Sequence, residues 1–156
     1  MRADLRELYQ SMILDHARAP RNFGRLADAS ASAHGHNPMC GDEVTVFLRL
    51  DEAGRIGAAA FEGNGCAICL ASASLMTGLL HGRSPQAAER LFAAFERLCS
   101  EHDFDEGTVA AEDREALRQL EVLSGVRAFP VRIRCATLPW QTLRAALHGE
   151  GEVSGE

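Results

Sequence analysis

Three cysteines and one aspartate stand out in the sequence as residues that could do chemistry. Cys40 and Asp42 lie two positions apart in the stretch Asn37-Pro38-Met39-Cys40-Gly41-Asp42, which places a thiol beside a carboxylate. Cys66 and Cys135 follow much later in the chain. Thiolates and carboxylates are both ligands that zinc takes in proteins. The pattern indicates metal or sulfur chemistry, although the same cysteines could be small buried apolar residues.

Cys66 and Cys135 are each predicted to lie at the start of a helix. A thiol in that position is close to unpaired backbone amides and to the positive end of the helix dipole, which stabilise the thiolate. Both residues should therefore ionise more readily than an ordinary cysteine. The spacing matches no generic zinc-finger pattern, so spacing alone leaves both interpretations of the cysteines open.

The bulk properties suit a single folded domain. The chain has 156 residues, of which 46% are hydrophobic, enough to bury one sizeable core. We predict one domain over residues 1–148 and a disordered tail over 149–156, because that tail is rich in Gly, Glu and Ser. A formal net charge of −6, with arginines scattered along the chain, argues against nucleic-acid binding.

The N-terminus and the cysteine count predict a cytoplasmic protein with no membrane partner. The first residues carry charge and lack the apolar region of a secretory signal, and no apolar run reaches the ~18 residues that a membrane span needs. Five cysteines without an export signal are typical of reduced thiols in a cytosol. An odd number of cysteines also fits poorly with a closed disulfide framework.

The first half of the chain predicts one helix followed by a pair of strands. Apolar residues recur at helical spacing over residues 4–18, with Asp4 as the expected N-cap. Residues 27–36 are small and polar without periodicity and are predicted to form a loop. Residues 43–50 and 55–62 are predicted strands joined by a hairpin turn. Any further strand would have to come from the loop that precedes them.

The second half of the chain predicts mostly helices. Residues 66–80 are apolar on most faces, which is typical of a buried central helix. Another helix should begin at Ser84-Pro85, and residues 113–123 and 135–147 are predicted to be helical as well. The stretch 126–134 contains a proline and is predicted to be extended or irregular. The expected fold class is α+β, a small antiparallel sheet packed with several helices.

Several further segments carry distinctive residues in a fixed order. They are Leu8-Tyr9-Gln10, Asp15-His16, Pro20-Arg21-Asn22-Phe23-Gly24, Phe61-Glu62-Gly63-Asn64-Gly65-Cys66-Ala67-Ile68, Ala71-Ser72-Ala73-Ser74-Leu75-Met76-Thr77 and Phe129-Pro130-Val131-Arg132-Ile133-Arg134-Cys135-Ala136-Thr137-Leu138-Pro139-Trp140. Together with the stretch around Cys40, they resemble the SufU/IscU (NifU N-terminal-like) family of iron–sulfur cluster assembly proteins. The resemblance runs from the first predicted helix to the last.

Three departures from the scaffold branch of that family, IscU, make the chain look like the SufU branch. Arg134 stands where IscU typically has a histidine before its last cysteine. Phe129-Pro130-Val131-Arg132 stands where IscU has a Leu-Pro-Pro-Val-Lys motif for chaperone docking. An extra segment, roughly residues 82–107, separates the second and third cysteines of the motif.

The resemblance implies a zinc-dependent sulfurtransferase. It makes Cys40, Asp42, Cys66 and Cys135 the zinc ligands and Cys40 the sulfur acceptor. The sulfur would come from the persulfide of a SufS-type, PLP-dependent cysteine desulfurase and pass on to a SUF-type assembly scaffold. The alternative within the family is an IscU-like scaffold that builds a [2Fe–2S] cluster on the same cysteines, for which thiolates are equally suitable. A small structural zinc domain without chemistry is a third possibility.

Five other residues could belong to the site. Cys69 follows Cys66 at Cys-x-x-Cys spacing, which suggests a spare ligand or a resolving thiol, but a small buried side chain is the more common case. Cys99 is predicted to be structural. His34 and His36 flank the Cys40 loop and are expected to be solvent-exposed rather than ligands. Arg132 could lie near the metal and offset the charge of its ligands, or simply be solvated.

Overall fold

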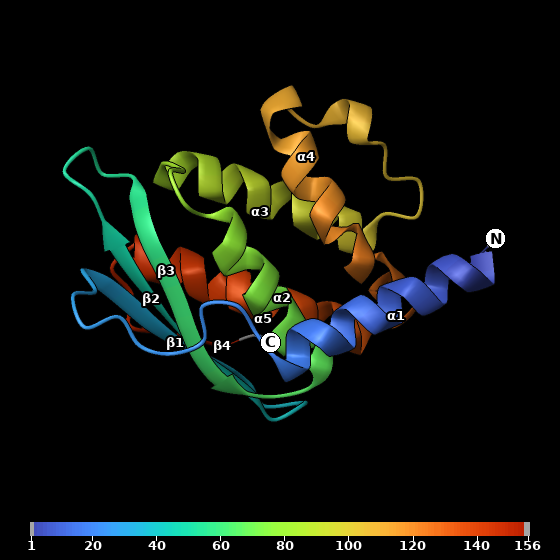
Figure 1. The fold of residues 1–156 in the computed structure, drawn as a ribbon, viewed down its shortest axis with the longest axis horizontal. Helices are drawn as coiled ribbons and strands as arrows, with labels where there is room; N and C mark the ends of the chain where they lie inside the picture. Colours follow the sequence, from blue (N-terminus) through green and yellow to red (C-terminus); the bar gives the residue numbers. More distant parts are fainter. Residues whose placement is uncertain (1, 155–156) are drawn as a thin grey trace.

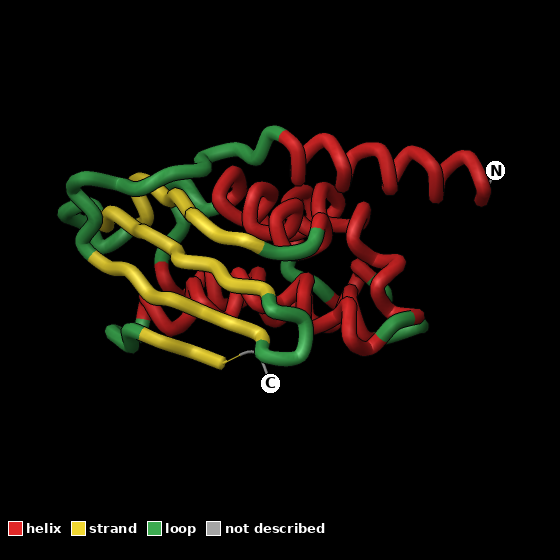
Figure 2. The backbone as a smooth tube through the Cα atoms, turned by 90° about the horizontal axis from the view of Figure 1, so that it is seen from below, coloured by secondary structure: helices red, strands yellow, loops and turns green. Residues whose placement is uncertain are grey.

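A four-stranded sheet with helices on one of its faces forms the fold (Figures 1 and 2). The structure is a computed structural model and describes residues 2–154. The strands are Ala31–Asn37 (β1), Asp42–Leu50 (β2), Ile56–Asn64 (β3) and Glu152–Ser154 (β4). The α-helices are Arg2–Arg18 (α1), Ala67–Leu79 (α2), Pro85–Ser100 (α3), Ala111–Leu120 (α4) and Pro130–Leu147 (α5), and Glu106–Thr108 (η1) and Glu121–Ala128 (η2) are 3-10 helices. This arrangement confirms the predicted α+β class.

The hairpin of β2 and β3 is the centre of the sheet and follows the sequence pattern. Val44, Val46 and Leu48 on β2 are buried against the helices, while the residues between them face outward. The turn that joins the strands places Gly54 at a φ of 81°, a conformation that costs glycine little. The alternating pattern of this segment therefore predicted both the strand and the side chains that it buries.

The first strand corrects the prediction of a loop over residues 27–36. β1 pairs antiparallel with β2, and Gly35 opposes Val44. A side-chain carbon at Gly35 would collide with the side chain of Thr142 on α5, so the glycine allows the strand to lie directly on that helix. Small and polar residues have weak strand propensity, and pairing with β2 overrides it.

The end of the chain corrects a second prediction. Residues Glu152–Ser154 were expected in a disordered tail, but they form β4 and pair parallel with β1, with Gly35 opposite Val153. The backbone N–H of His34 also donates to the Gly151 carbonyl at 2.8 Å. The last two residues of the predicted tail lie outside the described part of the chain. β4 makes the sheet mixed, because β1, β2 and β3 pair antiparallel.

The core lies between the sheet, α2, α3 and α5. The predicted central helix α2 is buried from Ala71 to Thr77. Trp140 on α5 is fully buried, and its ring centroid lies 6.0 Å from that of Phe92 and 5.2 Å from that of Phe95, both on α3. The Trp140 indole nitrogen donates to Ser72 Oγ on α2 at 3.2 Å. One aromatic side chain therefore connects three helices.

Two helix starts differ from their predicted positions. α1 begins at Arg2, so Asp4 lies inside the helix rather than at its N-cap. η2 and α5 occupy most of the stretch 126–134 that was expected to be extended. Pro130 is the reason for the second difference: it stands in the first turn of α5, where its missing N–H has no helical partner to lose. Cys135 consequently lies in the second turn of a helix and not at its start.

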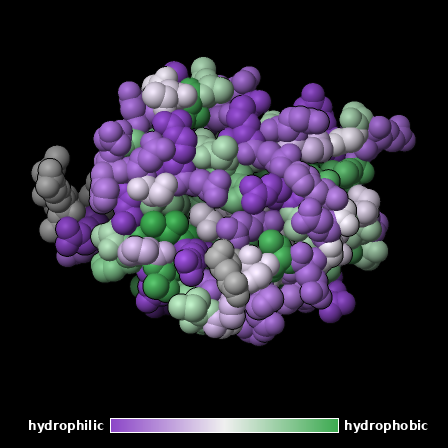
Figure 3. Space-filling model, turned by 180° about the vertical axis from the view of Figure 1, so that it is seen from behind, coloured by the Kyte–Doolittle hydropathy of each residue, from purple (hydrophilic) through white to green (hydrophobic). Residues whose placement is uncertain are grey.

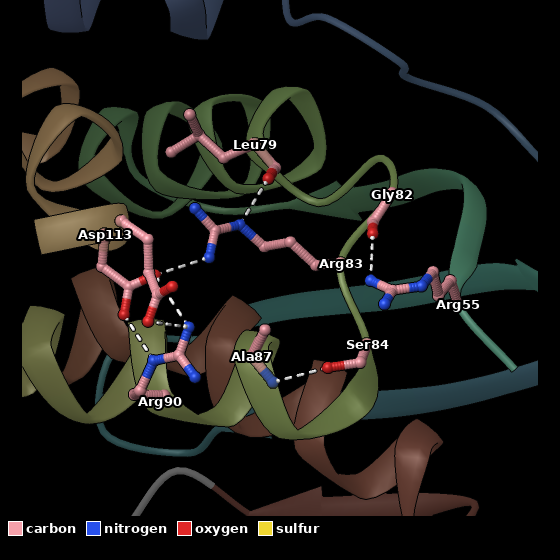
Figure 4. Close-up of polar contacts among 9 residues, drawn as sticks. Arg55, Leu79, Gly82, Arg83, Ser84, Ala87, Arg90 and Asp113 are labelled. Carbon is pink, nitrogen blue, oxygen red and sulfur yellow. Dashed lines mark hydrogen bonds and ion pairs between the residues drawn. The ribbon is translucent and has the colours of Figure 1, made fainter. Parts of the chain in front are cut away.

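A buried carboxylate ties α4 to α3 and to the end of α2. Asp113 is fully buried and accepts hydrogen bonds from Arg83 Nη1 at 2.9 Å and Arg90 Nε at 2.6 Å (Figure 4). Arg83 also donates to the Leu79 carbonyl at 3.0 Å, and Ser84 caps α3 as predicted by accepting from the Ala87 N–H. This network connects the extra segment predicted from the sequence, roughly residues 82–107, to α4.

The molecular surface, seen from behind, is mostly hydrophilic, with smaller apolar areas between the polar ones (Figure 3). Across residues 2–154, none of the helices combines the length and the apolar character needed to cross a membrane.

Candidate metal centre

The turn between β1 and β2 presents Cys40 and Asp42. Asn37 ends β1, and its carbonyl accepts the N–H groups of Cys40 at 3.3 Å and Gly41 at 2.8 Å. Gly41 has a φ of 74°, which glycine adopts readily and other residues rarely. The tight turn leaves Cys40 exposed, whereas Asp42 at the start of β2 is buried with an exposed fraction of 1%.

Cys66 and Cys135 reach the same end of the sheet from α2 and α5, two helices that pack on it. Cys66 is the N-cap residue of α2, close to the predicted position; its N–H donates to Asp42 Oδ1 at 2.9 Å, and its Sγ lies 3.9 Å from Asp42 Oδ2. Cys135 on α5 brings its Sγ to 3.5 Å from the Sγ of Cys40. Residues distant in sequence therefore surround one carboxylate.

Three of these side chains could hold a metal ion together. The ligand atoms of Cys40, Asp42 and Cys135 all lie within 4.8 Å of one another, which the structure shows for no other group of His, Cys, Asp or Glu side chains among its described residues. Cys66 contacts Asp42 but falls outside this set of mutual distances. Soft thiol ligands with one carboxylate form a donor set that suits zinc.

The electrostatics of the centre favour a cation. Burial raises the pKa of Cys135, and its hydrogen bonds with Asp42 and Cys40 raise that pKa further, because a second negative charge beside the carboxylate is unfavourable. Thiols bind a metal only as thiolates, so metal binding at this centre must displace protons. The site thus combines several potential anions with partial exclusion of water, an arrangement that a divalent cation stabilises.

The remaining candidate residues lie outside the metal-binding set. Cys69 is buried, and this burial raises the pKa of its thiol; the nearby Asp42, Cys66 and Cys40 raise it further, so the thiol stays protonated. Burial raises the pKa of Cys99 to about 12, so this thiol is inert, in agreement with the structural role expected for it.

Two histidines on β1 and two arginines at the start of α5 were the other candidates for a place near the centre. His34 Nδ1 is 2.9 Å from Thr45 Oγ1, and His34 Nε2 is 3.4 Å from Glu43 Oε1. Both ring nitrogens therefore contact residues of β2. His36 is exposed on β1. Arg132 and Arg134 are exposed in the first turns of α5 and not on an extended segment.

The sequence interpretation assigned no role to Asn37 or Gly65. Asn37 is fully buried and donates from Nδ2 to the Sγ of Cys40 at 3.5 Å. A carbon placed at Gly65 would lie 2.6 Å from Asp42 Oδ1. Both residues belong to the segments that carry the family resemblance, which is the one sequence signal that could have identified them. Only the folded chain shows what they contact.

The close approach of Gly65 to Asp42 leads to a testable prediction. We expect Gly65→Ala to displace the Asp42 carboxylate and lower zinc affinity by about tenfold, the loss typical of disturbing the surroundings of a metal ligand. Competition with a chromophoric chelator measures the affinity. Gly78→Ala is the matched control, because nothing lies within 4 Å of a carbon at that position in α2. It should leave zinc affinity unchanged and stabilise the helix by about 0.5–1 kcal/mol; equal zinc affinity in both variants would contradict the prediction.

The chain is similar to known proteins of iron–sulfur cluster assembly. The zinc-dependent sulfurtransferase SufU of Bacillus subtilis (strain 168) is 37% identical over 148 residues, which are 95% of either chain. The iron–sulfur cluster assembly scaffold protein IscU of Thermotoga maritima is 35% identical over 140 residues, 90% of this chain and 92% of that protein. A crystal structure described as an iron–sulfur cluster assembly scaffold protein for the SUF system, from Fervidobacterium islandicum AW-1, has a TM-score of 0.76 at 32% identity, covering 87% of this chain and 93% of that one.

A model of the NifU-like N terminal domain matches residues 8–136, a segment that contains Cys40, Asp42, Cys66 and Cys135. The match spans β1, β2 and β3, the turn of the candidate centre, α2 and the start of α5 that contains Cys135. Fold, site and sequence therefore lead to the same conclusion: the chain belongs to the NifU-like N-terminal domain family of SufU and IscU iron–sulfur cluster assembly proteins.

Proposed function

We propose that this protein is a cytoplasmic, zinc-dependent sulfurtransferase for iron–sulfur cluster biogenesis. It accepts persulfide sulfur from a SufS-type, PLP-dependent cysteine desulfurase and hands it to a SUF-type assembly scaffold. The observation that carries the proposal is the unequal exposure of the clustered thiols. Cys40 is exposed, whereas Cys66 is half-buried and Cys135 is fully buried. One thiol of the centre can meet a partner, and the others can hold a metal.

Cys40, Asp42, Cys66 and Cys135 would hold the zinc ion. Their donor atoms, three thiol sulfurs and one carboxylate oxygen, fit the four-coordinate preference of zinc. When bound, zinc would supply the positive charge that keeps these sulfurs deprotonated. Asp42 is the hard ligand among soft ones, and it already accepts the Cys66 N–H, so a backbone amide orients its carboxylate.

The transfer itself is a thiol exchange at sulfur. The Cys40 thiolate attacks the terminal sulfur of the desulfurase persulfide and forms a new S–S bond with it. The original S–S bond breaks, and its electron pair leaves with the desulfurase cysteine as a thiolate. No net oxidation occurs, because one persulfide replaces another. The exposed turn that contains Gly41 gives Cys40 the access that such an attack requires.

Exposed apolar side chains near Cys40 favour a protein partner. Met39 precedes the thiol, and Phe129 and Val131 lie where α5 begins, one turn before Cys135; their exposed fractions are 68%, 62% and 53%. Large apolar side chains left in water beside a functional group are typical of docking surfaces. A structural zinc site without a partner would have no need for them.

Disrupting this surface should weaken docking without disturbing the metal. We expect the double variant Met39→Asp, Val131→Asp to raise the concentration needed for half-maximal desulfurase stimulation by at least about tenfold, since central apolar contacts often contribute 2 kcal/mol or more. Zinc content should not change. Ala93→Asp on α3, an exposed position remote from the centre, is the control. Unchanged stimulation by the double variant would argue against docking at this surface.

The alternative function is an IscU-like scaffold that assembles a [2Fe–2S] cluster on the same thiols. The 35% identity to the Thermotoga maritima scaffold protein supports this alternative, and thiolates bind such clusters well. Metal analysis of protein purified without added metal separates the two functions. Zinc without visible absorbance supports sulfur transfer, whereas iron with visible absorbance supports the scaffold.

The deciding experiment for sulfur transfer is desulfurase turnover with and without this protein. Stimulated turnover, together with one added sulfur atom on Cys40 by mass spectrometry of the trapped intermediate, is the expected result. Zinc-loaded protein that neither stimulates turnover nor gains sulfur would contradict the proposal and favour a structural zinc domain.

A further inference from the structure

Asn37 is a buried amide next to the exposed thiol of the centre. It is the last residue of β1, has no exposed surface, and lies opposite Asp42 in the β1–β2 ladder. A primary amide in such a place is costly unless its hydrogen bonds are made. Its contacts therefore show what it does for the site.

The amide oxygen of Asn37 contacts the turn, and the amide nitrogen contacts the sulfur of Cys40. Asn37 Oδ1 accepts the N–H of Met39 at 3.0 Å, and Nδ2 is 3.5 Å from the Sγ of Cys40. The orientation of the amide follows from the first contact: Met39 N–H can only donate, so the atom facing it must be the oxygen. Within residues 2–154, the Cys40 sulfur is the one hydrogen-bond partner of the amide nitrogen.

We infer that Asn37 is a positioning residue for sulfur transfer: it fixes the Cys40 turn with its oxygen and donates a hydrogen bond to the reacting sulfur with its nitrogen. The inference rests on the proposed role of Cys40 as sulfur acceptor. An N–H group aimed at a sulfur stabilises negative charge there and orients the lone pair that attacks. The main-chain carbonyl of Asn37 adds to this control, because it accepts the N–H groups of Cys40 and Gly41.

Two substitutions separate the two ends of the side chain. In Asn37→Ser, the hydroxyl can still accept the Met39 N–H, as serine does in similar turns, but it is too short to reach the sulfur in the same way. Asn37→Ala removes both contacts. Asn22→Ser is the matched control: Asn22 also lies in a turn, and its amide donates to Thr77 Oγ1 at 3.2 Å, away from any sulfur.

The first measurement is persulfide formation on Cys40 with zinc-loaded protein. At saturating desulfurase, Asn37→Ser should lower the rate by about tenfold, the loss typical of removing a partner of a metal-bound ligand. The half-saturating concentration should stay within about twofold of that of the unmodified protein, since the docking surface is intact. Asn22→Ser should transfer sulfur at the unmodified rate. Equal rates for Asn37→Ser and the unmodified protein would overturn the inference.

The second measurement does not depend on transfer. In cobalt-substituted protein, a hydrogen bond to a thiolate raises the energy of the thiolate-to-cobalt charge-transfer band. The band should therefore shift to longer wavelength in Asn37→Ser and Asn37→Ala but not in Asn22→Ser. Loss of thermal stability with an unmoved band would assign Asn37 to the turn alone and overturn the donor role. If the unmodified protein transferred no sulfur while the band shifted, the proposed function would fail and the contact with sulfur would stand.

Discussion

Cys40→Ala is expected to reduce desulfurase turnover to the rate measured without this protein. Cys40 is the exposed thiol of the centre, and its sulfur is the proposed nucleophile. Cys135 cannot replace it, because Cys135 has no exposed surface and burial raises its pKa. Turnover assays with saturating variant protein, paired with mass spectrometry of the trapped protein, measure both stimulation and added sulfur.

Cys99→Ala is the matched control for this experiment. Cys99 is fully buried on α3 and inert, so its replacement removes a thiol without touching the centre. We expect stimulation and sulfur on Cys40 to remain as in the unmodified protein. Full stimulation by Cys40→Ala, or added sulfur on another cysteine of that variant, would show that Cys40 is not the acceptor.

Asp113→Ala is expected to have the largest effect on stability. Removing one partner from a buried ion pair typically costs about 3–5 kcal/mol, because the opposite charge is left without compensation. The side chain of Arg83 is only 17% exposed, so its charge would be left buried without a partner. The side chain of Arg90 is 45% exposed and can return to water, so we expect a loss near 3 kcal/mol, the lower end of the range. Urea unfolding measures it.

Glu106→Ala is the control for burial. Glu106 also pairs with an arginine, Arg118, at 3.0 Å, but both side chains are substantially exposed. Exposed ion pairs contribute little because water and salt screen them. The free energy of unfolding should therefore change far less in Glu106→Ala than in Asp113→Ala. Similar losses of unfolding free energy in the two variants would mean that burial does not determine how much Asp113 contributes to stability.

The effect of Asp113 should also depend on pH. Burial by itself raises the pKa of Asp113, but the hydrogen bonds from Arg90 and Arg83 outweigh it and hold the pKa below the ordinary value. A carboxyl with a lowered pKa contributes its full stability above the unfolded pKa of about 3.9 and loses it as the pH falls through the folded value. The stability difference between the unmodified protein and Asp113→Ala should thus be constant above about pH 5 and shrink below about pH 4.

Elements with a strong local pattern could be predicted from the sequence. The β2–β3 hairpin, the buried helix α2 and the start of α3 at Ser84-Pro85 were all predicted close to their observed positions. Each depends on interactions within a few residues, such as alternation, apolar periodicity or a capping hydroxyl.

Elements that depend on distant partners could not be predicted in this way. β1 and β4 have weak strand propensity: β1 forms because it pairs with β2, and β4 forms because it pairs with β1. The segment around Pro130 was expected to be extended, because a proline alone does not show whether it ends a helix or begins one. Packing of α5 on the sheet decided that question.

The sequence by itself determined which residues could do chemistry here: Cys40, Asp42, Cys66 and Cys135, with the family that they indicate. Only the tertiary structure decided which of them meet. Cys40 and Cys135 are 95 positions apart, yet their sulfurs lie 3.5 Å from each other, and Asn37 divides its amide between the turn and the sulfur. The physical reason is range. Side-chain type and spacing act over a few residues, whereas the convergence of a turn with residues of two helices requires a complete core to hold them together.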